Sequence, residues 1–147
     1  MRAFRFRLEK VLDWYGRQLQ MEERRFGMCL AALADADRAI AHLQAERIAV
    51  ERDLIARTSI PAREFVALGL YRLRAKAQEM ELNSQRDQRE AEVRAQRLRV
   101  QEAQRRVRLV EKLRERRLTE YAYAATRELD NLATDAYFAK WANLPEG

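Results

Sequence analysis

The sequence predicts an all-α fold, an elongated antiparallel coiled-coil hairpin of two helices, and three observations support this prediction. The 147 residues include only 4 Gly and 2 Pro, too few for the turns of an ordinary globular fold. Good helix formers such as Ala, Leu, Arg, Glu and Gln dominate the composition. Apolar residues recur with the 3.5-residue period of a coiled coil. We therefore expect a single domain over residues 1–147, with helices at about 4–57 and 62–142.

The first helix is predicted from a heptad repeat. Starting at Leu12, every seventh residue and the residue three positions further on are mostly apolar, and they form the predicted seam: Leu12, Tyr15, Leu19, Glu22, Phe26, Cys29, Leu33, Ala36, Ile40, Leu43, Arg47, Val50 and Leu54. Because this stripe persists over six heptads, it indicates a long helix packed along a partner helix. Gly16 and Gly27 lie off the seam, where each weakens the helix by about 1 kcal/mol relative to Ala.

Pro61 separates the two helices. Proline lacks the N–H that a helix interior needs, but it is tolerated in a first turn. We therefore expect a turn over residues 58–61, with Arg57 at the end of the first helix and Ser59 as the cap of the second. Since the connection is short, the helices are expected to be antiparallel.

The second helix is expected to continue to residue 142, because no further proline occurs before Pro145. Its apolar residues near the turn are assigned to the seam: Phe65, Val66, Leu68, Leu70, Tyr71, Leu73, Ala77, Met80 and Leu82. Further along the helix the seam continues in Val93, Val100, Val107 and Val110. Residues 83–92 offer almost nothing apolar, so the two helices should be most loosely packed there.

The end of the second helix carries a further group of apolar residues. Apolar positions resume at Leu118 and extend to Phe138 and Trp141, beyond the start of the first helix. Together with Phe4 and Phe6 they predict an aromatic end that two helices cannot fully bury. Exposed apolar surface of this kind indicates a binding partner.

The residue types that build catalytic or metal sites are almost missing. The chain has one histidine, His42, and one cysteine, Cys29. Neither a His/Cys metal cluster nor a catalytic triad with histidine and a nucleophile can be assembled from them, and no two glycines form a phosphate-binding loop. We expect no enzymatic activity, no metal and no cofactor. The single cysteine and the lack of a signal peptide or an apolar membrane span predict a cytoplasmic protein.

The net charge of +6 is concentrated in residues 86–117, which contain 12 basic and 6 acidic side chains. Three explanations are open: a solvated face with many salt bridges, a surface for an acidic protein, and a nucleic-acid-binding surface. Acidic residues are interleaved at helical spacing, as in Glu90 and Arg94, and they favour the solvated face.

Two segments resemble the FliJ family of flagellar type III export proteins. The opening Phe4-Arg5-Phe6-Arg7-Leu8-Glu9-Lys10-Val11-Leu12, followed by Glu22-Glu23 and a long seam, is similar to the start of that family. The stretch Val107-Arg108-Leu109-Val110-Glu111-Lys112-Leu113-Arg114-Glu115-Arg116, with Tyr121 and Glu128 after it, resembles its C-terminal part. Where the family usually has Asp-Glu, this chain has Asp130-Asn131.

The resemblance implies a non-enzymatic component of the flagellar type III protein export apparatus, with a coiled coil similar to the central stalk of rotary ATPases. Such a protein links the hexameric ring of the export ATPase, FliI, to the cytosolic domain of the export gate, FlhA, and assists the cycling of export chaperones. It binds no nucleic acid, and it associates peripherally with the inner-membrane export apparatus through these partners.

The residues that the resemblance assigns to partners form two groups. Those expected at the ATPase end are Phe4, Phe6, Leu8, Leu12, Glu111, Lys112, Leu113 and Tyr121. Those expected at the export gate, on the hairpin end, are Leu43, Val50, Phe65, Leu68 and Tyr71.

Two other functions are compatible with the same sequence. The equivalent stalk of an injectisome type III secretion system has the same shape and differs in its genomic neighbours. An Arg-rich nucleic-acid-binding coiled coil would depend on residues 86–117, and its affinity would fall steeply with salt.

Overall fold

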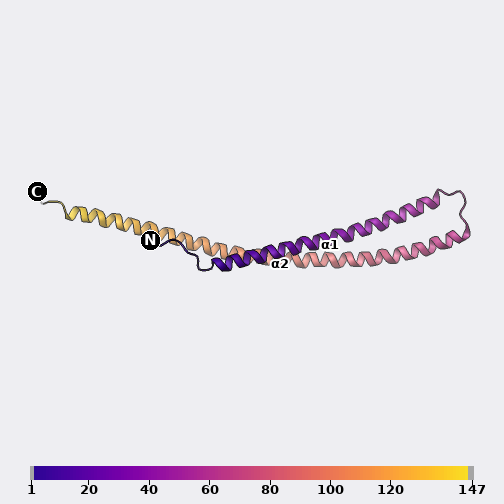
Figure 1. Ribbon diagram of the computed structural model, residues 1–147, viewed down its shortest axis with the longest axis horizontal. Helices are drawn as coiled ribbons and strands as arrows, with labels where there is room; N and C mark the ends of the chain where they lie inside the picture. The colour runs from indigo at the N-terminus through magenta and orange to yellow at the C-terminus, as the bar shows by residue number, and fades with distance from the viewer. Residues whose placement is uncertain (1, 146–147) are drawn as a thin grey trace. The chain divides into compact units, whose positions relative to one another are not determined.

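The computed structural model describes residues 2–145, and these form two helices without any strand. Helix α1 (Glu9–Ile55) has 47 residues and helix α2 (Ala62–Ala142) has 81, and residues 56–61 connect them (Figure 1). The predicted all-α helical hairpin is confirmed. The bounds of α2 agree with those expected from the sequence, whereas those of α1 differ at both ends.

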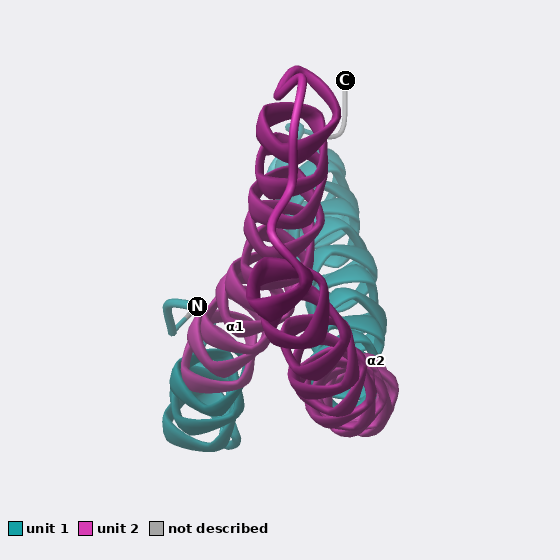
Figure 2. Cartoon of the chain, turned by 90° about the vertical axis from the view of Figure 1, so that its right-hand side faces the viewer, with its two compact units in different colours: residues 1–19, 103–147 teal, residues 20–102 magenta. Residues whose placement is uncertain are grey.

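Contacts divide the chain into two compact units (Figure 2). Unit 1 comprises residues 1–19 and 103–147, and unit 2 comprises residues 20–102. Each unit contains part of α1 and part of α2, because both helices continue from one unit into the other. Each unit therefore has its own segment of the seam.

Ion pairs between the helices of unit 2 show that α1 and α2 are antiparallel. They join residues separated by 7, 21, 32 and 49 positions in the sequence: Arg57–Glu64, Arg72–Glu51, Arg47–Glu79 and Arg86–Asp37. Each pair encloses the previous one along the chain. This nesting occurs only if the second helix returns along the first.

The predicted seam of α1 is confirmed. Every position from Leu12 to Leu54 in the predicted heptads is buried or partly buried except Val50, whose exposed fraction is 36%. Arg47, the basic residue in this stripe, lies 2.7 Å from the carboxylate of Glu79 on α2. A charge in the seam is therefore matched by an opposite charge.

The seam of α2 near the turn differs from the prediction. Several residues assigned to it have exposed fractions between 58% and 68%, namely Phe65, Val66, Leu70, Leu73 and Met80, and Ala77 is exposed as well. Leu68, Tyr71 and Leu82 of the predicted seam are partly buried, and Glu64, Ala75 and Glu79 complete the buried face. Two of these, Glu64 and Glu79, pair with Arg57 and Arg47 of the first half of the chain. The face that packs on α1 therefore includes two ion pairs, although the opposite face is more apolar.

Further along α2 the predicted seam is confirmed. Val93 is buried, and Val100, Val107 and Val110 are partly buried. Between Val93 and Val100 the seam contains Gln96, which has an exposed fraction of only 5%. Its amide donates hydrogen bonds to the backbone carbonyl of Glu22, at 3.1 Å, and to the carboxylate of the same residue. This buried amide is therefore satisfied, as buried polar groups require.

Residues 83–92, which lack apolar side chains, are joined to α1 by charge. The guanidinium of Arg86 lies 2.5 Å from Asp37 and 3.1 Å from Glu90. The hydrogen bond that Arg86 donates to Asp37, together with the charges of Asp37 and Glu90, raises the pKa of Arg86 above its ordinary value. This ion-pair network replaces the missing apolar contacts and fixes the position of the segment against α1.

The start of α1 was predicted wrongly. The helix begins at Glu9 and not at about residue 4. Residues 4–8 alternate between partly buried Phe4, Phe6 and Leu8 and exposed Arg5 and Arg7. A period of two is typical of an extended segment, whereas a helix would place Phe6 on the face opposite Phe4 and Leu8.

The connection also differs in detail from the expectation. Helix α1 ends at Ile55, two residues earlier than predicted. The carbonyl oxygen of Pro61 accepts from the N–H groups of Glu64, at 3.0 Å, and Phe65, at 3.4 Å. Pro61 therefore occupies the capping position that was expected for Ser59. Proline suits this position because it has no N–H to satisfy and its φ is already fixed.

Gly27 allows a test of how much a glycine within α1 reduces the stability of the protein. A Cβ at Gly27 would meet nothing within 4 Å, and its φ is not positive. Gly27→Ala should therefore stabilise the protein by about 1 kcal/mol, because alanine loses less backbone entropy in a helix. Chemical denaturation monitored by circular dichroism measures this change. Ala31→Gly, at an exposed position of the same helix, should have the opposite effect, and equal stability of both variants would contradict the helix assignment.

Candidate partner-binding surfaces

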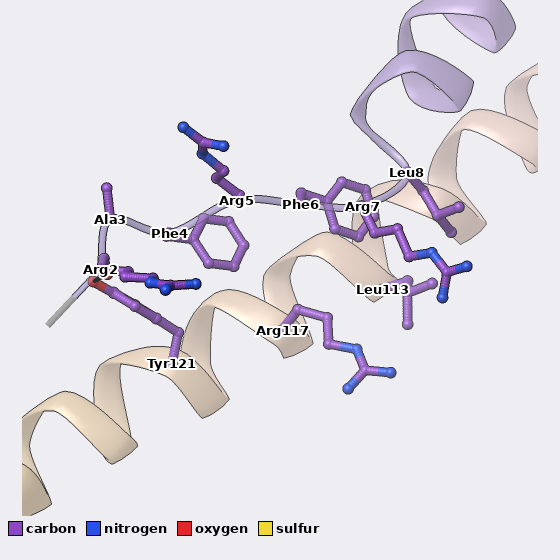
Figure 3. Close-up of a pocket in the computed structure, with 10 residues that line it drawn as sticks. All are labelled: Arg2, Ala3, Phe4, Arg5, Phe6, Arg7, Leu8, Leu113, Arg117 and Tyr121. Atoms are coloured by element: carbon purple, nitrogen blue, oxygen red, sulfur yellow. Dashed lines mark hydrogen bonds between the residues drawn. The ribbon is translucent and has the colours of Figure 1, made fainter.

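The N-terminal segment of unit 1 packs on α2 through aromatic rings (Figure 3). The ring centroids of Phe4 and Tyr121 are 5.5 Å apart, and the Tyr121 hydroxyl donates a hydrogen bond of 2.6 Å to the carbonyl of Arg2. The guanidinium of Arg114 lies 5.8 Å from the centre of the Phe4 ring and pairs with Glu9 at 3.2 Å. These contacts hold the extended segment against the helix although it forms no regular structure itself.

The same contacts form one side of a groove with a cavity volume of about 1080 Å³. The residues that line it are Arg2, Ala3, Phe4, Arg5, Phe6, Arg7, Leu8, Leu113, Arg117 and Tyr121. The groove thus combines apolar side chains with four arginines and contains no acidic residue. Figure 3 shows the guanidinium of Arg5 directed away from α2. Such a surface favours a partner segment that presents apolar side chains together with carboxylates.

Most residues predicted for the ATPase end lie at or near this groove. Phe4, Phe6, Leu8, Leu113 and Tyr121 line it. The others do not: Leu12 is a partly buried seam residue, and Glu111 and Lys112 are exposed on α2. The sequence prediction missed the arginines at positions 2, 5, 7 and 117. The alternation of Arg5 and Arg7 with Phe4 and Phe6 could have indicated this surface. In an extended segment such alternation places the apolar side chains on one side and the charged side chains on the other.

Beyond the groove, the end of α2 has no covering element in unit 1. Every residue from 126 to 145 is exposed. The rings of Tyr137, Phe138 and Trp141 contact only one another, with centroids 6.1 Å apart for Tyr137 and Phe138 and 6.4 Å apart for Tyr137 and Trp141. This end of the helix therefore presents apolar side chains on more than one face.

A second, smaller groove of about 320 Å³ lies beside the turn in unit 2. It is lined by Val50, Asp53, Leu54, Arg57, Glu64, Ala67, Leu68 and Tyr71. Arg57 lies 2.8 Å from Glu64 and 3.5 Å from Asp53, so the charges at its edge are already paired. The exposed part of this groove is therefore mainly apolar.

The residues predicted for the export gate are only partly brought together here. Val50, Leu68 and Tyr71 line the second groove. Leu43 has an exposed fraction of 5%, which makes it part of the seam and not of a surface. Phe65 is 58% exposed but does not line the groove.

Part of the basic stretch of residues 86–117 is ion-paired. Five of its arginines pair with nearby acids: Arg86 with Asp37 and Glu90, Arg89 with Glu92, Arg94 with Glu90, Arg114 with Glu9, and Arg117 with Glu120. Arginines paired in this way have less charge to offer to phosphates. For these five arginines the pattern supports the solvated, salt-bridged face.

Comparisons with protein families, curated proteins and solved structures find no match to this chain. Within residues 2–145, neither helix has an apolar stretch long enough to cross a membrane. The same part of the chain contains no group of three or more His, Cys, Asp and Glu side chains arranged to hold a metal ion.

The attachment of the N-terminal segment can be tested by proteolysis. Tyr121→Ala removes both the ring contact with Phe4 and the hydrogen bond to Arg2, so residues 2–8 should detach more often. We expect trypsin to cleave after Arg5 and Arg7 several times faster than in the wild type, since cleavage follows the population of the open form. Mass spectrometry of timed digests measures this rate. Tyr123→Ala, at a 71% exposed position, should cleave like the wild type, and equal rates for all three proteins would show that Tyr121 does not hold the segment.

Proposed function

We propose that the chain is a non-enzymatic component of the flagellar type III protein export apparatus, a stalk-like coiled coil that links the export ATPase ring to the export gate. One observation supports this proposal most. The two segments that resemble the FliJ family are far apart in sequence, yet Phe4 of the first and Tyr121 of the second pack together in one groove. If both segments form one binding surface, a protein with this function needs both of them.

The arginine-rich groove of unit 1 is the proposed contact with the ATPase. Arg5 and Arg7 form no ion pair among the described residues, and their charges are free to select a partner with carboxylates. Phe4 and Phe6 supply the apolar area that provides most of the binding energy. The apolar groove beside the turn, with Val50, Leu68 and Tyr71, is the proposed contact with the export gate.

A hairpin suits a connecting role because its two ends have different surfaces. The groove in unit 1 is basic and aromatic, and the groove in unit 2 is apolar with its charges internally paired. Two partners of different chemistry can therefore bind without competing for one site. Assistance in the cycling of export chaperones is part of the same proposal.

The contact with the ATPase is tested with the purified cognate enzyme. The wild-type chain should bind the hexamer and change its rate of ATP hydrolysis. Phe4→Ala should weaken binding about tenfold, as expected for loss of a central aromatic contact. Phe138→Ala, at a 64% exposed ring outside the groove, is the matched control and should bind like the wild type. A wild-type chain that neither binds nor affects the flagellar ATPase, but does so with an injectisome ATPase, would reassign the protein to that system.

The contact with the gate is tested with the cytosolic domain of the export gate protein. Val50→Asp places a charge in the apolar groove and should weaken binding at least tenfold, because the carboxylate loses water without gaining a partner. Ile48→Asp, two residues away at a 53% exposed position outside the groove, is the control. Isothermal titration calorimetry measures both affinities. Equal loss in both variants would place the contact elsewhere on α1.

A further inference from the structure

Helix α2 has a second apolar stripe near the turn, on the face opposite its seam. We define this turn-side stripe as Val66, Leu70, Leu73, Ala77 and Met80. The first four members lie two positions after the seam residues Glu64, Leu68, Tyr71 and Ala75, and Met80 continues the same heptad spacing. Two positions correspond to a rotation of about 200° around a helix, so the stripe lies on the face opposite the seam. The large members have exposed fractions between 62% and 68%. The stripe has the alternating four- and three-residue spacing of a coiled-coil seam, but no helix covers it.

A similar stripe lies at the other end of the same helix. We define the terminal stripe as Leu129, Leu132, Ala136 and Ala139, which again alternate by three and four residues. Leu129 is 66% exposed and Leu132 is 59% exposed, and both alanines are exposed. The aromatic cluster of Tyr137, Phe138 and Trp141 occupies other positions of the helix. This second stripe therefore also has the pattern of a coiled-coil seam without a partner.

The charges beside the two stripes are opposite. Lys76 immediately precedes Ala77 in the turn-side stripe, and Asp135 immediately precedes Ala136 in the terminal stripe. The two charged residues thus flank their stripes on the same side. Both are exposed, and neither forms an ion pair in the part of the chain that is described. In an antiparallel coiled coil, residues on the same flank of the two helices face each other.

We propose that the turn-side stripe of one copy binds the terminal stripe of a second copy as an antiparallel coiled coil, with Lys76 opposite Asp135. Both stripes belong to helix α2. The register that pairs Lys76 with Asp135 places a large residue opposite a small one in three layers, Leu70 with Ala139, Leu73 with Ala136, and Ala77 with Leu132, and pairs Met80 with Leu129 in the fourth. The large and small pairs allow close packing.

The charges favour the mixed pairing over symmetric ones. With Leu73 opposite Ala77, two turn-side stripes in antiparallel contact bring Lys76 and Arg74 of one copy close to the same residues of the other. With Leu132 opposite Ala136, two terminal stripes bring Asp135 close to itself. Like charges across a coiled coil disfavour a pairing, and opposite charges favour it. Only the mixed pairing places opposite charges beside the stripes.

Each contact is short, so the association depends on concentration. One contact leaves a free stripe on each copy, and larger assemblies form unless the two copies exchange both contacts. Sedimentation equilibrium of the full chain should accordingly show an average mass that rises with concentration. A chain that remains monomeric up to its solubility limit would overturn the proposal.

Charge exchange tests the pairing itself. Lys76→Asp and Asp135→Lys should each weaken the association about fivefold or more, because an attractive pair becomes repulsive. An equimolar mixture of these two variants restores opposite charges between copies and should associate like the wild type. Lys112→Asp and Asp130→Lys make the same changes at exposed positions outside both stripes and should have no effect. Association that is unaffected by the exchange, or that is not restored in the mixture, would refute the proposed register.

The apolar contact is tested separately. Leu73→Glu should abolish self-association, whereas Leu98→Glu, at a 66% exposed position outside the stripes, should preserve it. Both side chains are exposed in the single chain, so circular dichroism should show intact helices in both variants. Equal effects of the two changes would overturn the proposal. No measurement here involves an export partner, so the inference stands or fails independently of the proposed function.

Discussion

The packing of only two helices against each other is the constraint on which the rest of this structure depends. A two-helix coiled coil has one line of contact and no interior. Among residues 2–145 only four apolar residues, Leu43, Ala75, Val93 and Ala103, are buried, together with Gln96. Apolar contacts along so thin a seam hold the helices together but do not select one register. A shift by one heptad only replaces one apolar contact by another. The alignment must come from groups that have a specific partner.

Polar pairs across the seam supply that alignment. Arg47 pairs with Glu79 and Arg86 with Asp37, and the buried amide of Gln96 reaches Glu22. A shift by one heptad would take the buried amide of Gln96 and the partly buried Arg47 away from these partners, which costs more than the loss of a favourable contact. The segment 83–92, which lacks apolar residues, adds the contact of Arg86 with Asp37, and Arg86 also pairs with Glu90 within α2.

The same reasoning explains which parts of the fold could be predicted from the sequence. The seam of α1 was predictable because its apolar residues keep one heptad register over six heptads. The seam of α2 near the turn was not, because Val66, Leu70 and Leu73 form a stripe as regular as that of Leu68 and Tyr71. The face that is buried includes Glu64 and Glu79, whose partners are Arg57 in the connection and Arg47 on α1. A pattern within one helix does not contain this information.

The N-terminal segment shows a related limit. Five of the residues predicted for the ATPase end line one groove, but they were predicted within a helix that begins too early. The alternation of Phe4, Phe6 and Leu8 with arginines indicates an extended chain, yet the segment has no strand beside it. It is held by Tyr121, far away in the sequence. Its conformation is therefore set by a contact that only the folded hairpin provides.

Charges in this protein divide into two groups with different consequences. Arginines that pair within the hairpin are largely neutralised, and an exposed pair contributes little net stability, so these residues mainly set alignment and solubility. Arg5 and Arg7 beside the aromatic groove, and Lys76 and Asp135 beside the exposed stripes, have no such pair in the described chain. An apolar surface attracts any other apolar surface, but an unpaired charge at its edge rejects partners with the same charge. Unpaired charges at the edges of these apolar surfaces therefore decide which partners bind, since apolar contact alone does not discriminate between partners.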